Sequence, residues 1–88
     1  MNVKTSEGLE ITVIENAFDD LEALDALREM DEGNPLAVSK IMDLLFSKEE
    51  KKKFYDFCRD KKTNRVPLEK SLAVLTEIMG LLGTKEKN

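Results

Sequence analysis

The stretch from residue 35 to residue 46 most restricts how this chain can fold, because apolar side chains surround more than half of it. They are those of Val38, Ile41, Met42, Leu44, Leu45 and Phe46. At about 100° per residue of a helix, only Ser39, Lys40 and Asp43 form a polar strip. A helix this apolar must be covered from several sides, so we expect it in the middle of a small helical bundle.

Capping residues predict where this helix and the preceding one lie. Asn34 is a favourable N-cap, and Pro35 suits the first helical position because the N–H that proline lacks has no helical partner there. Before it, Asp19 or Asp20 can cap a first helix, which Gly33 ends in a left-handed conformation. The expected apolar face of this first helix consists of Ala17, Leu21, Leu24, Leu27 and Met30.

Two further helices follow. Residues 47–50, Ser-Lys-Glu-Glu, form a capping box that begins a third helix. Its apolar line is thin, comprising Phe54, Phe57 and Cys58, so we expect it at the periphery. Pro67 predicts the start of the fourth helix, and Gly83 its end.

The first residues predict a β-hairpin. Residues 2–5 and 9–13 alternate or are rich in β-branched side chains, and Gly8 in the intervening segment permits a turn. Because two strands alone are marginally stable in water, the hairpin should lie on the helices through Val3, Leu9, Ile11 and Val13. The expected fold is a mostly α, four-helix single domain over residues 1–83, with an N-terminal β-hairpin (2–13) and a polar tail (84–88).

The fourth helix carries two adjacent apolar lines. The first consists of Leu68, Leu72, Leu75, Met79 and Leu82, and the second of Val74, Ile78 and Leu81. Together they sweep roughly 180° of the helix, where packing on one side needs little more than about 100°. Either both lines are buried within the fold, or one line meets a partner. On the second interpretation, the candidate partner-binding residues are Val74, Ile78, Leu81 and Leu82.

The residue types argue against catalysis, metal binding and a cofactor. The chain has no histidine and a single cysteine, Cys58, so neither a zinc set nor a base for a thiol nucleophile is present. We expect Cys58 to be a half-buried hydrophobic residue. The glycines do not form a phosphate-binding motif. No apolar run approaches the roughly 20 residues that span a bilayer, and the first residues do not resemble a secretory signal, so we expect a cytosolic protein without a membrane partner.

Charge is distributed unevenly along the chain. Residues 1–46 carry 3 basic and 11 acidic side chains, whereas residues 47–88 carry 11 basic and 7 acidic ones. The two halves can attract each other within one fold, or they can orient partners or further copies of the chain. The basic residues between 48 and 65 are interleaved with acidic ones, which favours a solvated surface over binding to nucleic acid or to an acidic protein.

The order of these features resembles the tail assembly chaperones of long-tailed, non-contractile phages. The resemblance rests on Lys4-Thr5-x-x-Gly8-x-Glu10-Ile11, the acidic helix ending in Asp31-Glu32-Gly33-Asn34-Pro35, the run Arg65-Val66-Pro67-Leu68-Glu69-Lys70, and Leu75-Thr76-Glu77-Ile78. It covers roughly residues 2 to 82. The chain departs from the family pattern in its basic loop before Arg65 and in the aromatic residues of its third helix.

The resemblance implies a stoichiometric function without a cofactor. Such proteins coat the long, helical tape-measure protein, keep it soluble, help recruit tail-tube subunits, and leave before the virion is finished. Many also exist in a longer form made by ribosomal frameshifting. The expected partners are therefore the tape-measure and tail-tube proteins in the host cytoplasm. Further copies of the chain are a possible partner as well. A small protein-binding adaptor or regulator, phage-borne or bacterial, is the alternative.

Overall fold

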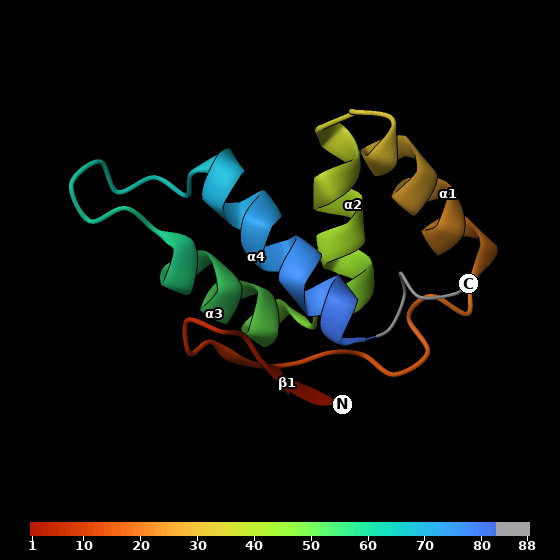
Figure 1. The fold of residues 1–88 in the computed structure, drawn as a ribbon, viewed down its shortest axis with the longest axis horizontal. Helices are drawn as coiled ribbons and strands as arrows, with labels where there is room; N and C mark the ends of the chain where they lie inside the picture. The colour runs from red at the N-terminus through yellow and green to blue at the C-terminus, as the bar shows by residue number, and fades with distance from the viewer. Residues whose placement is uncertain (83–88) are drawn as a thin grey trace.

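Four helices and an N-terminal hairpin form the fold in the computed structural model, which describes residues 1–82 (Figure 1). The elements are β1 (Asn2–Lys4), β2 (Glu10–Thr12), α1 (Leu21–Asp31), α2 (Leu36–Leu45), α3 (Lys48–Cys58) and α4 (Leu68–Leu81). This order confirms the expected fold class. The predicted helix end at Gly83 and the polar tail at 84–88 lie outside the described residues.

Helix α2 contributes to the core along its whole length, as its apolar circumference predicts. Its buried side chains are those of Ala37, Val38, Ile41, Met42 and Leu45. The side-chain oxygen of Asn34 accepts a hydrogen bond from the backbone N–H of Leu36, at 3.0 Å. The helix itself begins at Leu36 with Pro35 at the N-cap position, one residue later than predicted. The predicted left-handed turn between α1 and α2 is confirmed by Gly33, which has a φ of 96°.

Helix α1 packs against α2 through a different face from the one that we expected. Ala23 and Ala26 are fully buried, whereas Leu21 and Leu24 are 75% and 49% exposed. The buried residues lie three apart, and the partly buried Leu27 extends the same helical face. Small alanine side chains let two helices approach closely, which a pattern based on the largest apolar residues does not reveal. The assignment of Leu21 and Leu24 to the core face was therefore wrong.

The hairpin covers the helices as predicted. Its strands are antiparallel, with Val3 opposite Ile11. Leu9, Ile11 and Val13 are buried, and Val3 is half-buried against the same core. Gly8 has a φ of 101°, which the tight turn requires and an L side chain rarely adopts.

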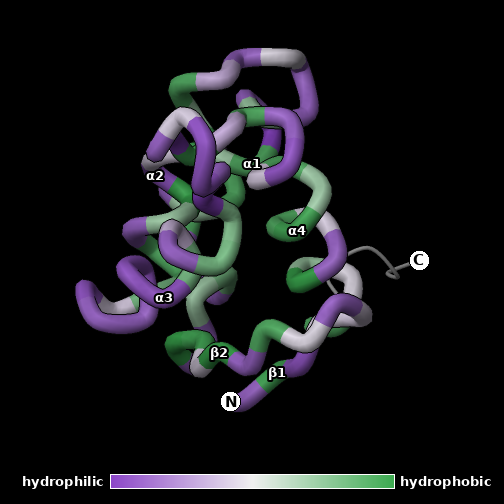
Figure 2. The backbone as a smooth tube through the Cα atoms, turned by 90° about the vertical axis from the view of Figure 1, so that its left-hand side faces the viewer, coloured by the Kyte–Doolittle hydropathy of each residue, from purple (hydrophilic) through white to green (hydrophobic). Residues whose placement is uncertain are grey.

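Helices α3 and α4 complete the core. Phe54 of α3 is fully buried, and the centroid of its ring lies 5.7 Å from that of Phe46. Cys58 is also fully buried, rather than half-buried as we expected. Figure 2 shows a largely hydrophilic α3 and hydrophobic stretches on α4 and on the hairpin. Phe54 and Cys58 of α3 thus lie deep in the core, and Phe57 is partly buried, although most of this helix faces solvent.

The hairpin is also held by carboxylates from α3 and α4. Ser47 caps α3 by accepting a hydrogen bond from the N–H of Glu50, at 3.3 Å, as the capping box predicts. The Glu50 carboxylate instead accepts a hydrogen bond from the N–H of Thr12, at 2.8 Å. On α4, Glu77 accepts one from the N–H of Ser6, at 2.6 Å. These two contacts attach the strand β2 and the hairpin turn to different helices.

Candidate partner-binding surface

The four candidate residues on α4 do not share one environment. Ile78 is fully buried and Val74 is 7% exposed, so both belong to the domain core. Leu81 is 51% exposed and Leu82 is half-buried. The interpretation in which the line through Val74 and Ile78 meets a partner was therefore wrong, because α4 crosses the middle of the fold and is covered on both apolar sides (Figure 1). Of the four candidates, only Leu81 and Leu82, at the end of α4, retain exposed surface.

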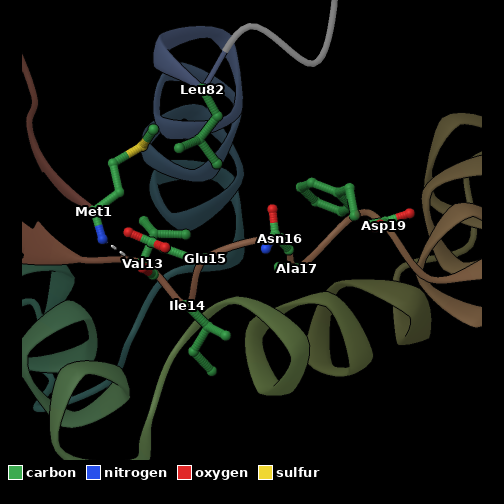
Figure 3. A pocket seen from close by; sticks show the side chains of 9 residues that line it. Met1, Val13, Ile14, Glu15, Asn16, Ala17, Asp19 and Leu82 are labelled. Carbon is green, nitrogen blue, oxygen red and sulfur yellow. Dashed lines mark hydrogen bonds between the residues drawn. The ribbon is translucent and has the colours of Figure 1, made fainter.

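A pocket of about 650 Å³ lies beside this end of α4 (Figure 3). Its lining residues are Met1, Val13, Ile14, Glu15, Asn16, Ala17, Phe18, Asp19 and Leu82. In Figure 3 the side chains of Met1 and Leu82 point toward each other across it. Segments from both ends of the described chain therefore form one partly apolar concave surface.

The backbone of the segment that forms one wall of this pocket is fixed by hydrogen bonds. Met1 and Val13 exchange two of them, at 2.7 and 3.0 Å. The N–H of Ile14 donates to the carbonyl of Leu45 at the end of α2, at 2.8 Å. Ile14 is thus held in place while its side chain stays 45% exposed. The N–H of Asp19 donates to the carbonyl of Asn16, at 3.0 Å, in a turn where Asn16 has a φ of 60°.

This surface was only partly visible in the sequence. Leu82 was among the candidates, but Met1, Ile14 and Phe18 were not. The available signal was the pair Val13-Ile14: consecutive apolar residues break the alternation of a strand, so that one of them must face away from the core. Val13 is buried and Ile14 is exposed, as this reasoning would have predicted.

Acidic groups lie at the pocket. The side chains of Glu15 and Asp19 line it and both residues are exposed. Within residues 1–82, neither carboxylate has a hydrogen-bond or ion-pair partner. Asp20 beside them caps α1 by accepting a hydrogen bond from the N–H of Glu22, at 2.8 Å. The pocket therefore lies next to the acidic residues at the start of α1.

Among residues 1–82, ion pairs form mostly within each half of the chain, so the acidic first half and the basic second half do not neutralise each other. Among the described residues, Arg28 pairs with Asp25 of α1 and with Glu32 directly after it, and the pairs of α3 are mostly internal to that helix. Only the pair between Lys51 and Asp43 joins the two halves within residues 1–82, and it bridges neighbouring helices. The charge asymmetry seen in the sequence thus remains on the surface.

A basic loop lies at the opposite end of the molecule from α1, along its longest axis (Figure 1). The N–H of Asp60 donates to the carbonyl of Arg65 at 2.8 Å, and that of Asn64 donates to the carbonyl of Asp60 at 2.7 Å. These bonds close the loop and leave Lys61, Lys62 and Arg65 exposed. Their side-chain cations contact no carboxylate in the part of the chain that the structure describes.

Among residues 1–82, the side chains that could take part in catalysis or metal binding are either not clustered or buried in the core. Burial raises the pKa of the Cys58 thiol, against the smaller opposing effect of a hydrogen bond with Ser71. A buried thiol of raised pKa is a poor nucleophile. No cluster of three or more potential metal ligands occurs among residues 1–82.

None of the helices within residues 1–82 has the length and hydropathy to cross a membrane. Comparisons with protein-family models, with curated proteins and with solved structures find no match for this chain.

Proposed function

We propose that this protein is a phage tail assembly chaperone, which binds the tape-measure protein, keeps it soluble and helps to recruit tail-tube subunits. The family is suggested by the sequence resemblance described above. The observation that carries the proposal is the pocket beside the end of α4, where Met1, Ile14 and Leu82 offer apolar surface to another protein.

The binding surface proposed here replaces the one inferred from the sequence. Val74 and Ile78 stabilise the domain, whereas Ile14, Leu82 and neighbouring residues contact the partner. A long helical protein exposes apolar stripes that favour aggregation, and many copies of a small domain with an open apolar pocket can cover them. The action is stoichiometric binding rather than catalysis, in the host cytoplasm and before the virion is complete.

Co-expression with the tape-measure protein tests this function. The chain should keep the tape-measure protein in the supernatant after centrifugation, and the variant Ile14→Asp should not. Leu68→Asp is the matched control, because Leu68 is 52% exposed but lies at the start of α4, next to the basic loop. A tape-measure protein that stays insoluble with the wild-type chain rules out the chaperone function. Equal solubilisation by Ile14→Asp rules out this surface.

Recruitment of the tail tube is tested separately. Purified tail-tube protein should be retained on an affinity-tagged tape-measure protein only when the chain is present. Retention without the chain would contradict a recruiting function. If tape-measure binding itself fails, a small adaptor or regulator that uses the same pocket for another protein becomes the better assignment.

A second candidate function is nucleic-acid binding, which the exposed loop cations Lys61, Lys62 and Arg65 favour. Phosphate contacts release counterions, so such binding weakens steeply as the salt concentration rises. DNA retention at low salt that is lost on replacing these three residues with alanine would support this function. We rank it below the chaperone because the chain as a whole is acidic, with a net charge of −4.

A further inference from the structure

The pocket is lined by both apolar and acidic side chains. Val13, Ala17 and Leu82 contribute apolar surface, and Glu15 and Asp19 contribute carboxylates. A carboxylate that faces solvent without a partner is available to a cation from another molecule. Charges at the edge of an interface select and orient partners more than they increase affinity.

Among residues 1–82, no cation forms an ion pair with Glu15 or Asp19, although the N-terminal ammonium group of Met1 lies at the same pocket, where it donates a hydrogen bond to the carbonyl of Val13. Arg28, the basic residue of α1, is engaged by Asp25 and Glu32. The exposed loop with Lys61 and Lys62 lies at the opposite end of the molecule (Figure 1). Within residues 1–82, the two carboxylates at the pocket thus outnumber its one ammonium group, and a basic partner would balance the remaining negative charge.

The backbone at the pocket argues against binding of an extended strand. Val13 already exchanges both of its hydrogen bonds with Met1, and the N–H of Ile14 is bonded to Leu45. A partner strand cannot form a ladder with groups that are already bonded. A helix needs no such ladder, because its own backbone is satisfied internally, and it can insert side chains spaced three and four residues apart.

We infer that the pocket lined by Ile14, Phe18 and Leu82 binds a basic amphipathic helix. Apolar side chains of that helix enter the pocket, and flanking lysines or arginines contact Glu15 and Asp19. The inference rests on the proposed function and specifies which segments of a tape-measure protein the domain recognises: those whose apolar stripe is bordered by positive charge.

A pair of synthetic peptides tests the preference for a basic helix. Both have about 20 residues, because isolated helices shorter than about 15 residues are marginal in water, and both carry leucines at helical spacing. One has lysines on its remaining faces and the other has glutamates at the same positions. By fluorescence anisotropy of labelled peptide, the lysine peptide should bind the full chain at least about tenfold more tightly at low ionic strength. Equal binding of the two peptides would overturn the inference.

Charge reversal on the protein locates the interaction. The double variant Glu15→Lys/Asp19→Lys should bind the lysine peptide about tenfold more weakly. The matched control is Glu7→Lys/Asp31→Lys, which makes the same change in net charge at two exposed residues away from the pocket. If both variants bound the lysine peptide equally weakly, net charge alone would explain the loss of binding, and the inference would be overturned. Circular dichroism checks the fold of each variant. The comparison of the lysine and glutamate peptides uses the wild-type chain, so it tests the inference even if a variant does not fold.

A third comparison tests the apolar contact. Ile14→Ser should weaken binding of the lysine peptide by about tenfold or more, since burial of an isoleucine side chain contributes at least about 1.5 kcal/mol. Leu68→Ser should leave it unchanged. A different outcome is that the chain associates with itself, does not bind the peptide, and loses self-association in Glu15→Lys/Asp19→Lys. This result would assign the pocket to the basic loop of a second copy and overturn the inference.

The outcomes separate this inference from the proposed function. If the chain solubilises the tape-measure protein but does not distinguish the peptides, the function stands and the basic-helix preference fails. If the lysine peptide binds at the pocket but the tape-measure protein stays insoluble, the preference stands and the chaperone function fails.

Discussion

Glu77 on α4 accepts two hydrogen bonds from Ser6, which lies 71 residues earlier in the hairpin turn. One comes from the backbone N–H, at 2.6 Å, and the other from the hydroxyl group, at 3.2 Å. This contact and the hydrogen bond that the N–H of Thr12 donates to Glu50 give the hairpin polar as well as apolar attachments to the helices. Because two strands have little stability of their own, such attachments determine whether the hairpin stays docked.

Replacing Glu77 with alanine should therefore weaken the docking of the hairpin. We expect the free energy of unfolding to fall by about 0.5–1.5 kcal/mol, the usual net contribution of a hydrogen bond. Urea denaturation followed by circular dichroism measures it. Thr76→Ala, at an exposed neighbour on the same helix, is the control. Equal effects of the two substitutions would show that the Ser6 contact contributes nothing to stability.

The Glu50 contact should make stability depend on pH. The hydrogen bond from the N–H of Thr12 lowers the pKa of Glu50 below its ordinary value of 4.5, despite the opposing effect of burial. A group whose pKa is lowered on folding stabilises the fold above its unfolded pKa, and this stabilisation is lost as the pH falls through the folded pKa. Wild type should have a higher urea midpoint than Glu50→Gln at neutral pH, and the difference should shrink in acid below 4.5. A pH-independent difference would contradict this assignment.

Substitutions in α4 should separate its buried residues from its exposed end. Ile78→Ala should cost about 2–5 kcal/mol of stability, because it leaves a cavity in the core. Ile78→Glu should unfold the domain, since an unpaired charge would then be buried. Leu81→Glu should remain folded, because Leu81 is 51% exposed. Helical content by circular dichroism is the measurement, and a folded Ile78→Glu variant would place Ile78 at the surface.

Cys58 should react slowly with a thiol reagent in the native protein. Its side chain is buried in the core, and burial raises the pKa of the thiol, so little thiolate is present or accessible at neutral pH. A disulfide reagent such as 5,5′-dithiobis(2-nitrobenzoate) should label it rapidly only after unfolding in urea. Rapid labelling without denaturant would show that the α3–α4 contact opens readily.

Local residue patterns determined the secondary structure of this protein. Helix starts depend on short-range contacts, such as the hydrogen bond from Leu36 to the side chain of Asn34, and these follow from neighbouring residue types. The same holds for the hairpin turn, where Gly8 adopts a positive φ. The apolar character of more than half of the circumference of α2 also predicted its burial: Ala37, Val38, Ile41, Met42 and Leu45 are buried.

The tertiary structure alone decided which apolar residues remain available to a partner. Periodicity shows that α4 has two apolar lines and α1 has several leucines, but it does not show which neighbours cover them. Close packing of α1 through Ala23 and Ala26 leaves Leu21 outside, while the hairpin and the other helices bury Ile78. The pocket forms from Met1, Ile14 and Leu82, which are distant in sequence, so its existence depends on long-range packing rather than on any local pattern.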